Sequence, residues 1–213
     1  MPRHRDAGSL GTSGQNTADL PLVLGSASPR RRELLGLLGV PFLVRAADID
    51  ETFRPGETPD AYLDRITQAK LEAVRDGTSV ASRGILVADT IVVAPDGEFP
   101  VLGKPRDDED ARAMLALLSG ATHEVKTRFV LAGTAPGPSL HAETVTTQVL
   151  FRALGAEEIE RYVEEGEGRD KAGAYAVQGR AAAFVSRIEG SYTGVVGLPV
   201  CEVAVAMRAL GWV

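Results

Sequence analysis

Apolar and polar residues follow two patterns along the chain. Short apolar runs bounded by turn residues predict strands, and stretches with apolar residues every three or four positions predict helices. In chain order the predicted elements are strand 20–24, helix 29–38, strand 42–46, helix 60–75, strand 84–94, strand 98–102, helix 107–118, strands 124–132 and 144–151, helix 156–164, strand 183–188 and helix 199–210. The turn Asp96-Gly97 makes strands 84–94 and 98–102 a hairpin, so part of the sheet is expected to be antiparallel. The sequence therefore predicts an α/β fold in which helices flank a mixed twisted sheet.

The first residues differ from the rest of the chain. Residues 1–19 are rich in Gly, Ser, Thr, Asn and charge and show neither periodicity, so they are expected to form a disordered leader. Residues 20–213 show no internal repeat and are expected to form a single domain.

Composition narrows the class of partner. The chain has 213 residues, of which 44% are hydrophobic, enough for one large core or for two small lobes that share a cleft. Its formal net charge of −6 argues against general binding to nucleic acid or to a membrane surface. A small-molecule partner is therefore expected.

The single cysteine and the lack of long apolar runs suggest a compartment. Cys201 has no second cysteine to pair with, and its apolar neighbours predict a buried free thiol in a reducing environment. No run approaches the ~18 apolar residues of a membrane span, and the start lacks a hydrophobic signal core. We expect a cytoplasmic protein without a membrane partner.

Three arginines stand where a helix should begin. Ser28 is placed to cap the helix and Pro29 to be its first residue, so the helix dipole should disfavour Arg30 and Arg31 at this end. A phosphate group would resolve the conflict, because the hydroxyls of Ser26 and Ser28, the free N–H groups and the guanidinium groups could all contact it. The alternative is an exposed basic helix start paired with surface acids.

Two charged residues fall on faces that should be buried. Asp89 interrupts the apolar strand 84–94, where an unpaired carboxylate would cost several kcal/mol. Lys70 falls on the apolar stripe of helix 60–75. The pair suggests a shared site, although Asp89 could be a structural partner of one arginine and Lys70 could extend along its helix to solvent.

Two loops offer further charged groups. Gly103-Lys104-Pro105 presents a lysine from a rigid loop, without the pattern of a P-loop, and the alternative is an ordinary solvated lysine. Asp48, Asp50 and Glu51 follow a strand and suit a hard cation such as Mg²⁺, and the alternative is a solvated acidic turn.

Other chemistries lack their defining residues. His4, His123 and His141 form no zinc-binding pair, and neither G-x-S-x-G nor G-x-G-x-x-G is present. In the glycine-rich stretch 168–179, Gln178 could read a base edge with its donor and acceptor groups, or simply bond to backbone.

Taken in order, these motifs resemble the Maf-type nucleoside triphosphate pyrophosphatases, a family linked to septum formation. The resemblance runs from Leu22 to about Ala209. It rests on Ser26-Ala27-Ser28-Pro29-Arg30-Arg31, Asp50-Glu51, Lys70, Ala88-Asp89-Thr90, Gly103-Lys104-Pro105, Asp170 to Tyr175, Gln178-Gly179, Gly190-Ser191-Tyr192 and Val195 to Pro199. Ala176-Val177 replaces the usual Gly-Ile, and Thr127-Arg128 replaces the usual Thr-Gly, which puts the local strand geometry in question.

The resemblance implies a fold, a reaction and a cofactor. The fold would be similar to that of inosine triphosphate pyrophosphatases, with two lobes around a nucleotide cleft and a homodimer as the frequent assembly. The reaction would convert a nucleoside triphosphate and water to the monophosphate and pyrophosphate, with Mg²⁺ or Mn²⁺, and the motifs look like the branch that acts on dTTP and UTP.

The same resemblance implies residue roles. Arg30, Thr90 and Gln178 match specificity positions, and Asp89 matches the proposed proton acceptor. Our hypothesis assigns catalysis to Glu51, Lys70, Asp89 and Lys104, substrate binding to Ser26, Ser28, Arg30, Arg31, Thr90 and Gln178, and the metal to Glu51 and Asp89. Two alternatives stay open: a house-cleaning pyrophosphatase for modified pyrimidine nucleotides, and a non-catalytic nucleotide-binding regulator of cell division.

Overall fold

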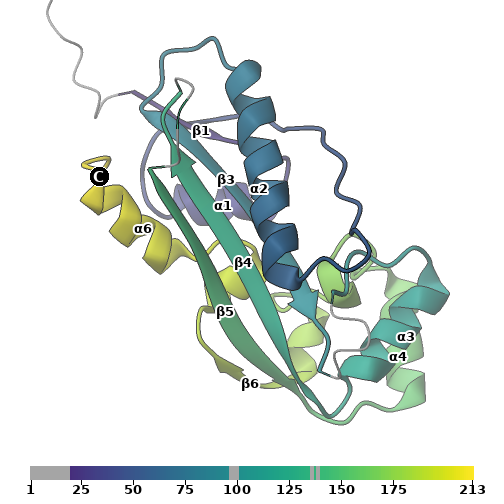
Figure 1. The fold of residues 1–213 in the computed structure, drawn as a ribbon. Coiled ribbons are helices and arrows are strands. Elements are labelled where there is room, and N and C mark those ends of the chain that lie inside the picture. Colours follow the sequence, from purple (N-terminus) through teal and green to yellow (C-terminus); the bar gives the residue numbers. More distant parts are fainter. Residues whose placement is uncertain (1–19, 96–100, 135–136, 138–139) are drawn as a thin grey trace, which may run out of the picture.

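One six-stranded sheet runs through the computed structural model, which describes residues 20–95, 101–134, 137 and 140–213 (Figure 1). The expected leader, residues 1–19, and most of the expected strand 98–102 lie outside these ranges. The strands are β1 (Leu22–Leu24), β2 (Phe42–Val44), β3 (Gly84–Val93), β4 (Thr122–Ala132), β5 (His141–Phe151) and β6 (Val185–Glu189). The helices are α1 (Pro29–Gly36), α2 (Pro59–Asp76), α3 (Asp108–Leu118), α4 (Ala156–Glu165), α5 (Tyr192–Val196) and α6 (Val200–Ala209), with 3₁₀ turns η2 (Ala172–Ala174) and η3 (Arg180–Ala183).

The strand order is β2-β1-β3-β4-β5-β6. β1 pairs in parallel with β2 and β3, whereas β3, β4, β5 and β6 pair in antiparallel fashion. The predicted mixed sheet is confirmed. Of the predicted hairpin, the described residues show one antiparallel bridge between Val92 and Leu102.

Helices cover both faces of the parallel end of the sheet. Leu22, Leu24, Leu86 and Ala88 pack with α1 and α6, and the intervening residues Val23, Ile85 and Val87 pack with α2. Successive residues of a strand point to opposite faces, so a strand buried on both sides needs a continuous apolar run. This arrangement explains the unbroken apolar sequence of β3 before Asp89.

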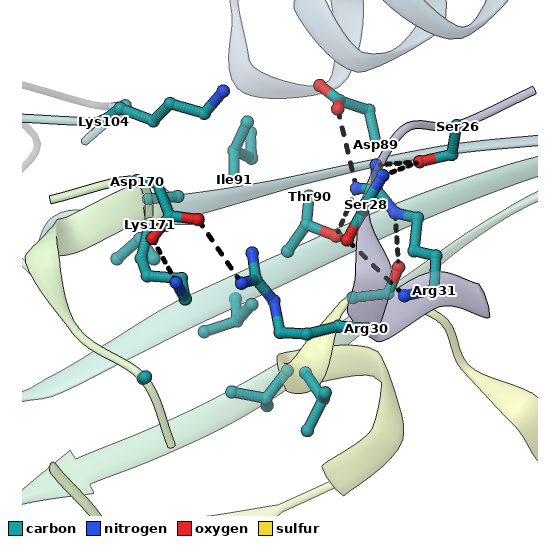
Figure 2. A pocket seen from close by; sticks show the side chains of 18 of the residues that line it. Ser26, Ser28, Arg30, Arg31, Asp89, Thr90, Ile91, Lys104, Asp170 and Lys171 are labelled. Carbon is teal, nitrogen blue, oxygen red and sulfur yellow. Dashed lines mark hydrogen bonds and ion pairs between the residues drawn. The ribbon is translucent and has the colours of Figure 1, made fainter. Parts of the chain in front are cut away.

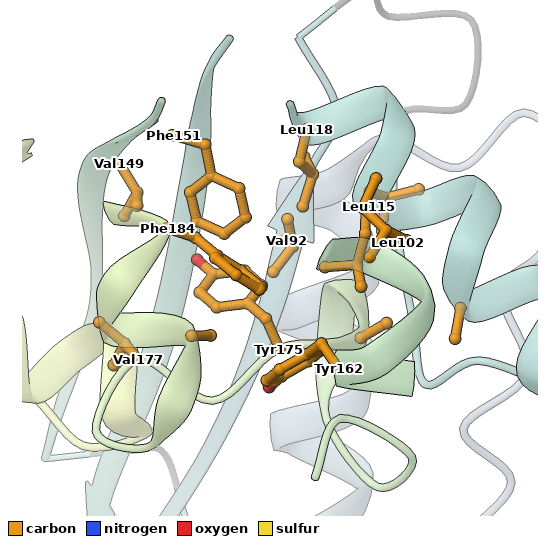
Figure 3. Close-up of a cluster of buried hydrophobic side chains, with 14 of the residues drawn as sticks. Val92, Leu102, Leu115, Leu118, Val149, Phe151, Tyr162, Tyr175, Val177 and Phe184 are labelled. Atoms are coloured by element: carbon orange, nitrogen blue, oxygen red, sulfur yellow. The ribbon is translucent and has the colours of Figure 1, made fainter. Parts of the chain in front are cut away.

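A second core lies at the antiparallel end. There β3, β4 and β5 pack with α3 and α4, and the rings of Phe151, Tyr162, Tyr175 and Phe184 fill the space between them (Figure 3). Phe151 meets Tyr175 nearly edge-on, with 4.9 Å between ring centroids, a favourable geometry for aromatic pairs. The two cores agree with the expectation of two lobes.

Several local expectations need correction. The expectation of a buried Cys201 was wrong: its thiol is free but exposed. α6 buries Val203, Ala206 and Met207, so Cys201 and Val205, four residues apart, share the opposite face. The short helix α5 was not predicted.

The strand geometry at Thr127-Arg128, which the sequence put in question, is regular. β4 keeps an unbroken register with both neighbours, and Arg128 Nη2 lies 2.6 Å from Asp64 Oδ1 on α2. Within the described ranges, no helix combines the length and apolarity needed to cross a bilayer.

His123 is the buried polar side chain of the second core. It is 1% exposed, its Nε2 lies 2.9 Å from the Tyr175 hydroxyl, and its Nδ1 has no hydrogen-bond partner among the described residues. Burial lowers its pKa to about 4. The imidazole is therefore neutral in the folded protein at pH 7.

We expect His123 to make stability depend on pH. Between about pH 6.5 and 4 the unfolded state binds a proton on this residue that the folded state does not, so the free energy of unfolding should fall as pH falls, by about 3 kcal/mol in all. Urea unfolding at pH 7, 6 and 5 should show this extra loss in the wild type and not in His123→Phe. Tyr175→Phe should keep the slope, because burial and not the hydroxyl causes the shift; equal slopes in wild type and His123→Phe would contradict the assignment.

Candidate active site

A cavity of about 500 Å³ lies between the two ends of the sheet. All ten residues to which our hypothesis assigned a role line it: Ser26, Ser28, Arg30, Arg31, Glu51, Lys70, Asp89, Thr90, Lys104 and Gln178. They come from segments far apart in the chain. The volume is in the range of small-molecule binding sites.

The cavity exists because β1 is shorter than β3. The amide of Gly25 donates to the carbonyl of Leu86, after which the chain leaves the sheet and enters α1. Beyond that point, the edge of β3 that faces β1 has no described strand beside it until the amide of Leu102 donates to the carbonyl of Val92, while β4 pairs with the other edge throughout. Asp89, Thr90 and Ile91 therefore line the cavity instead of pairing with a neighbour on that side.

The start of α1 has the expected cap. Ser28 accepts from the amide of Arg31 at 3.4 Å, Pro29 begins the helix, and the Ser26 hydroxyl accepts from the amide of Ser28 at 3.2 Å. Both hydroxyls and the first turn of the helix face the cavity together with Arg30 and Arg31 (Figure 2). This arrangement matches an anion site at a helix N-terminus.

Arg31 is held inside the site rather than on the surface. Its Nε donates to the carbonyl of Gly197 at 2.8 Å, while Nη1 and Nη2 donate to the hydroxyls of Ser26 and Thr90, each at 3.3 Å. Gly197 has φ +135°, a conformation that favours glycine. Burial lowers the pKa of Arg31, and the carboxylate of Asp89, 3.7 Å from Nη2, opposes that shift. The alternative of an exposed basic helix start does not describe Arg31.

Lys70 joins two carboxylates. Its Nζ lies 2.7 Å from Glu51 Oε1 and 2.7 Å from Asp89 Oδ1. Lys70 is 7% exposed and Asp89 8%, so the lysine does not extend to solvent and the aspartate is paired. Tyr62 donates to the main-chain carbonyl of Glu51 at 2.9 Å, which fixes the approach of this residue to α2. Burial raises the pKa of Tyr62, so its hydroxyl stays protonated and remains a donor.

Of the acidic run, Glu51 alone lines the cavity. Asp50 accepts from the amide of Thr52 at 2.9 Å, and hydrogen bonds from the side chain and then the amide of Thr52 lower its pKa. Glu51 and Asp89 thus supply two carboxylates that converge on one point. No group of three or more metal-binding side chains is found in the described part of the chain.

The opposite wall comes from the loops after β3 and before β6. Lys104 is exposed and lies on the other side of the cavity from Arg31 (Figure 2). The amide of Gly173 donates to the carbonyl of Gly103 at 3.0 Å, which ties the two loops together. Asp170 reaches toward the first wall, 3.6 Å from Arg30, and also pairs with Lys171.

The segment that carries Gln178 is fixed on both sides. The amide of Ala176 donates to the Tyr162 hydroxyl at 3.0 Å, and the amide of Arg180 donates to the Glu167 carboxylate. A Cβ at Gly179 would lie 2.1 Å from Glu167 Oε1, so a larger residue there would push this carboxylate away from the amide of Arg180. Gln178 itself is exposed, and its side chain makes no hydrogen bond within the described residues. Its amide is available to a ligand.

Some residues of the site were not predicted. Asp170 and Lys171 belong to a motif of the resemblance but were given no role, since only Gln178 of this segment was, and the carbonyl of Gly197 carries no side-chain signal. Thr127 was detectable in principle, because it is a hydroxyl at an inward position of β4, between the buried Val125 and Phe129.

Comparison with known proteins gives a consistent result. The family model described as Maf-like protein matches residues 21–210. A protein of Chromobacterium violaceum named dTTP/UTP pyrophosphatase is 46% identical over 200 residues, covering 92% of this chain and 98% of its own. One of the same name from Anaeromyxobacter dehalogenans is 49% identical over 192 residues, covering 90% and 94%.

Among solved structures, the Staphylococcus aureus Ham1 protein is 13% identical with a TM-score of 0.45, over 77% of this chain and 90% of that one. The match of the family model over nearly the whole described chain, together with these relatives, shows that this chain belongs to the Maf-like protein family.

Proposed function

We propose that this protein hydrolyses dTTP and UTP to the nucleoside monophosphate and pyrophosphate. The observation that carries the proposal is the pairing of Asp89 and Glu51 with Lys70 in the same cavity as the arginine turn of α1. The names of the relatives point to the same reaction. A buried carboxylate beside a phosphate site has little use in a protein that only binds nucleotides, which argues against the regulator alternative.

The triphosphate would lie between the two cationic walls. Ser26, Ser28, Arg30 and Arg31 contribute hydroxyl, amide and guanidinium donors from the start of α1, and Lys104 contributes an ammonium group from the other side. These fixed positive charges stabilise the negative charge that develops on pyrophosphate as it leaves.

Asp89 would act as the general base. Its carboxylate takes a proton from water, and the water oxygen attacks the α-phosphorus. The bond from that phosphorus to the oxygen bridging to the β-phosphate breaks, and pyrophosphate leaves with the electron pair. Lys70 holds Asp89 Oδ1 at 2.7 Å and so fixes the direction of the carboxylate during this step.

Glu51 and Asp89 would also hold the divalent cation, either Mg²⁺ or Mn²⁺. Two converging carboxylates with no third protein ligand in the described residues fit Mg²⁺, which binds through one or two carboxylates and substrate phosphates. When bound, the cation would neutralise phosphate charge. Lys70, which bridges the two carboxylates, would keep them together.

The apolar half of the cavity would receive the base. Val92, Val125, Tyr175, Val177, Val195 and Val196 line it, and Thr90 and Gln178 offer polar groups at its margin. The homodimer, the cytoplasmic location and the single folded domain expected from the sequence stay predictions.

The test of the function is product analysis with dTTP, UTP, CTP, GTP and ATP in Mg²⁺. We expect monophosphate and pyrophosphate from dTTP and UTP, and a loss of at least about 100-fold in kcat/KM in Asp89→Asn, because the general base is removed without a change of shape. Asp50→Asn, which alters an acid outside the cavity, should keep wild-type turnover. Activity of Asp89→Asn within tenfold of wild type would exclude Asp89 as the base.

Removal of Lys104 should slow turnover of every triphosphate equally. Lys104→Ala loses a phosphate contact shared by all substrates, so we expect kcat/KM for dTTP and UTP to fall by the same factor, about tenfold or more. Lys126→Ala is the control, since Lys126 pairs with Asp60 away from the cavity lining. An effect confined to one base would mean that Lys104 reads the base.

The metal site can be tested without turnover. Calorimetric titration with Mn²⁺ alone should show binding to the wild-type protein that is at least about tenfold weaker in Glu51→Gln, because one of the two carboxylates is lost. Asp48→Asn, in the same acidic run but outside the cavity lining, should bind like wild type. Unchanged affinity in Glu51→Gln would remove Glu51 from the metal site.

A further inference from the structure

Two threonine hydroxyls meet at the floor of the cavity. Thr90 of β3 and Thr127 of β4 are register partners, and their Oγ1 atoms lie 2.9 Å apart. Thr90 lines the cavity, whereas Thr127 is 1% exposed and lies behind it. A ligand can therefore contact Thr90 but not Thr127.

The direction of the hydrogen bond between them follows from a third group. Thr127 Oγ1 lies 2.8 Å from the carbonyl oxygen of Gly194, which can only accept. A hydroxyl has one proton, and Thr127 donates it to the carbonyl of Gly194. In its contact with Thr90, Thr127 must therefore be the acceptor. The segment that contains Gly194 is fixed in turn, because the amide of Ser191 donates to Thr147 Oγ1 at 3.0 Å.

Thr90 is thereby left without a proton for a ligand. Its proton points at Thr127, and one of its two lone pairs accepts from Arg31 Nη2 at 3.3 Å. Because Thr90 lines the cavity, the other lone pair is the group that it can offer to a ligand. Toward a ligand, Thr90 is a hydrogen-bond acceptor and not a donor.

The surroundings of Thr90 indicate which part of a substrate meets it. Consecutive residues of a strand point to opposite faces, so Thr90 points away from the side on which Asp89 binds Lys70 and toward the apolar wall that includes Val92. Arg31 contacts Thr90 from the phosphate side, so Thr90 lies where the phosphate end of the cavity meets this apolar wall. A flat apolar base suits the wall better than a phosphate does.

We infer that Thr127 is a positioning residue that makes Thr90 select bases with a ring N–H. Uracil and thymine carry a donor at N3, whereas the N3 of neutral cytosine is an acceptor and would face the lone pair of Thr90. The inference rests on the proposed function, because it assumes that a pyrimidine triphosphate is the substrate. It assigns to a buried residue a part of the discrimination against CTP.

The test compares kcat/KM for UTP and CTP in three proteins. Thr127→Val keeps the shape of the side chain but accepts no hydrogen bond, so the hydroxyl of Thr90 can turn its proton toward the cavity. We expect the UTP to CTP ratio to fall about tenfold or more in Thr127→Val. Thr127→Ser restores the hydroxyl and should keep a ratio within about twofold of wild type. A wild-type ratio in Thr127→Val, or an equal loss in Thr127→Ser, would overturn the inference.

A double variant separates positioning from a general structural effect. In a Thr90→Val background, Thr127→Val should change the ratio no further, because the group that it orients is gone. A further fall of the ratio in the double variant would contradict the role given to Thr127. Thermal unfolding of each variant reports how much stability is lost when the Gly194 carbonyl loses its donor.

The sugar offers another donor that could meet Thr90. If Thr90 accepted from the 3′-hydroxyl, Thr127→Val would alter the ratio between UTP and 3′-deoxy-UTP and leave the UTP to CTP ratio unchanged, which would refute the assignment to the base. Failure of the wild type to hydrolyse any pyrimidine triphosphate would instead refute the proposed function.

Discussion

The structure depends on one buried cation shared by two carboxylates. Lys70 reaches from α2 to Asp89 on β3 and to Glu51 in the loop before α2, so one side chain connects a helix, a strand and a loop. A buried carboxylate without a partner would be strongly destabilising. The apolar packing of α2 on the sheet therefore has to place Lys70 within reach of Asp89. As a result, the packing that positions the helix also assembles the site.

Strand length decides where this site can open. β1 has three residues and β3 has ten, and the difference leaves the far half of β3 with side chains on both faces near one cavity. The charged groups around Asp89 lie toward α2, and the apolar groups around Val92 lie toward α3 and α4. A substrate with a charged end and an apolar end matches this division.

The charged residues of the site could be predicted from the sequence, because burying a charge is costly and its position in an apolar pattern is therefore conspicuous. Asp89 and Lys70 stand out because a charge on an apolar face must find a partner, and Arg31 stands out because a cation at a helix N-terminus is unfavourable. The alternation of β4 places Thr127 on the inward face, but a buried hydroxyl is a weaker signal than a buried charge, because a threonine suits any strand. The carbonyl of Gly197 could not be predicted, because a carbonyl is present at every residue. The prediction that Cys201 is buried was wrong because the buried residues of α6 lie along one stripe of the helix, and Cys201 lies outside that stripe.

The hydrogen bonds that Arg31 donates restrict which amino acid can occupy position 31. Three of its N–H groups point in different directions to the carbonyl of Gly197 and the hydroxyls of Ser26 and Thr90, a spread that a planar guanidinium spans and a single ammonium does not. The side chain is thus dehydrated and oriented when the chain folds. An anion that binds here does not have to order the side chain of Arg31. The site is preorganised because the residue is an arginine, and not only because it is positively charged.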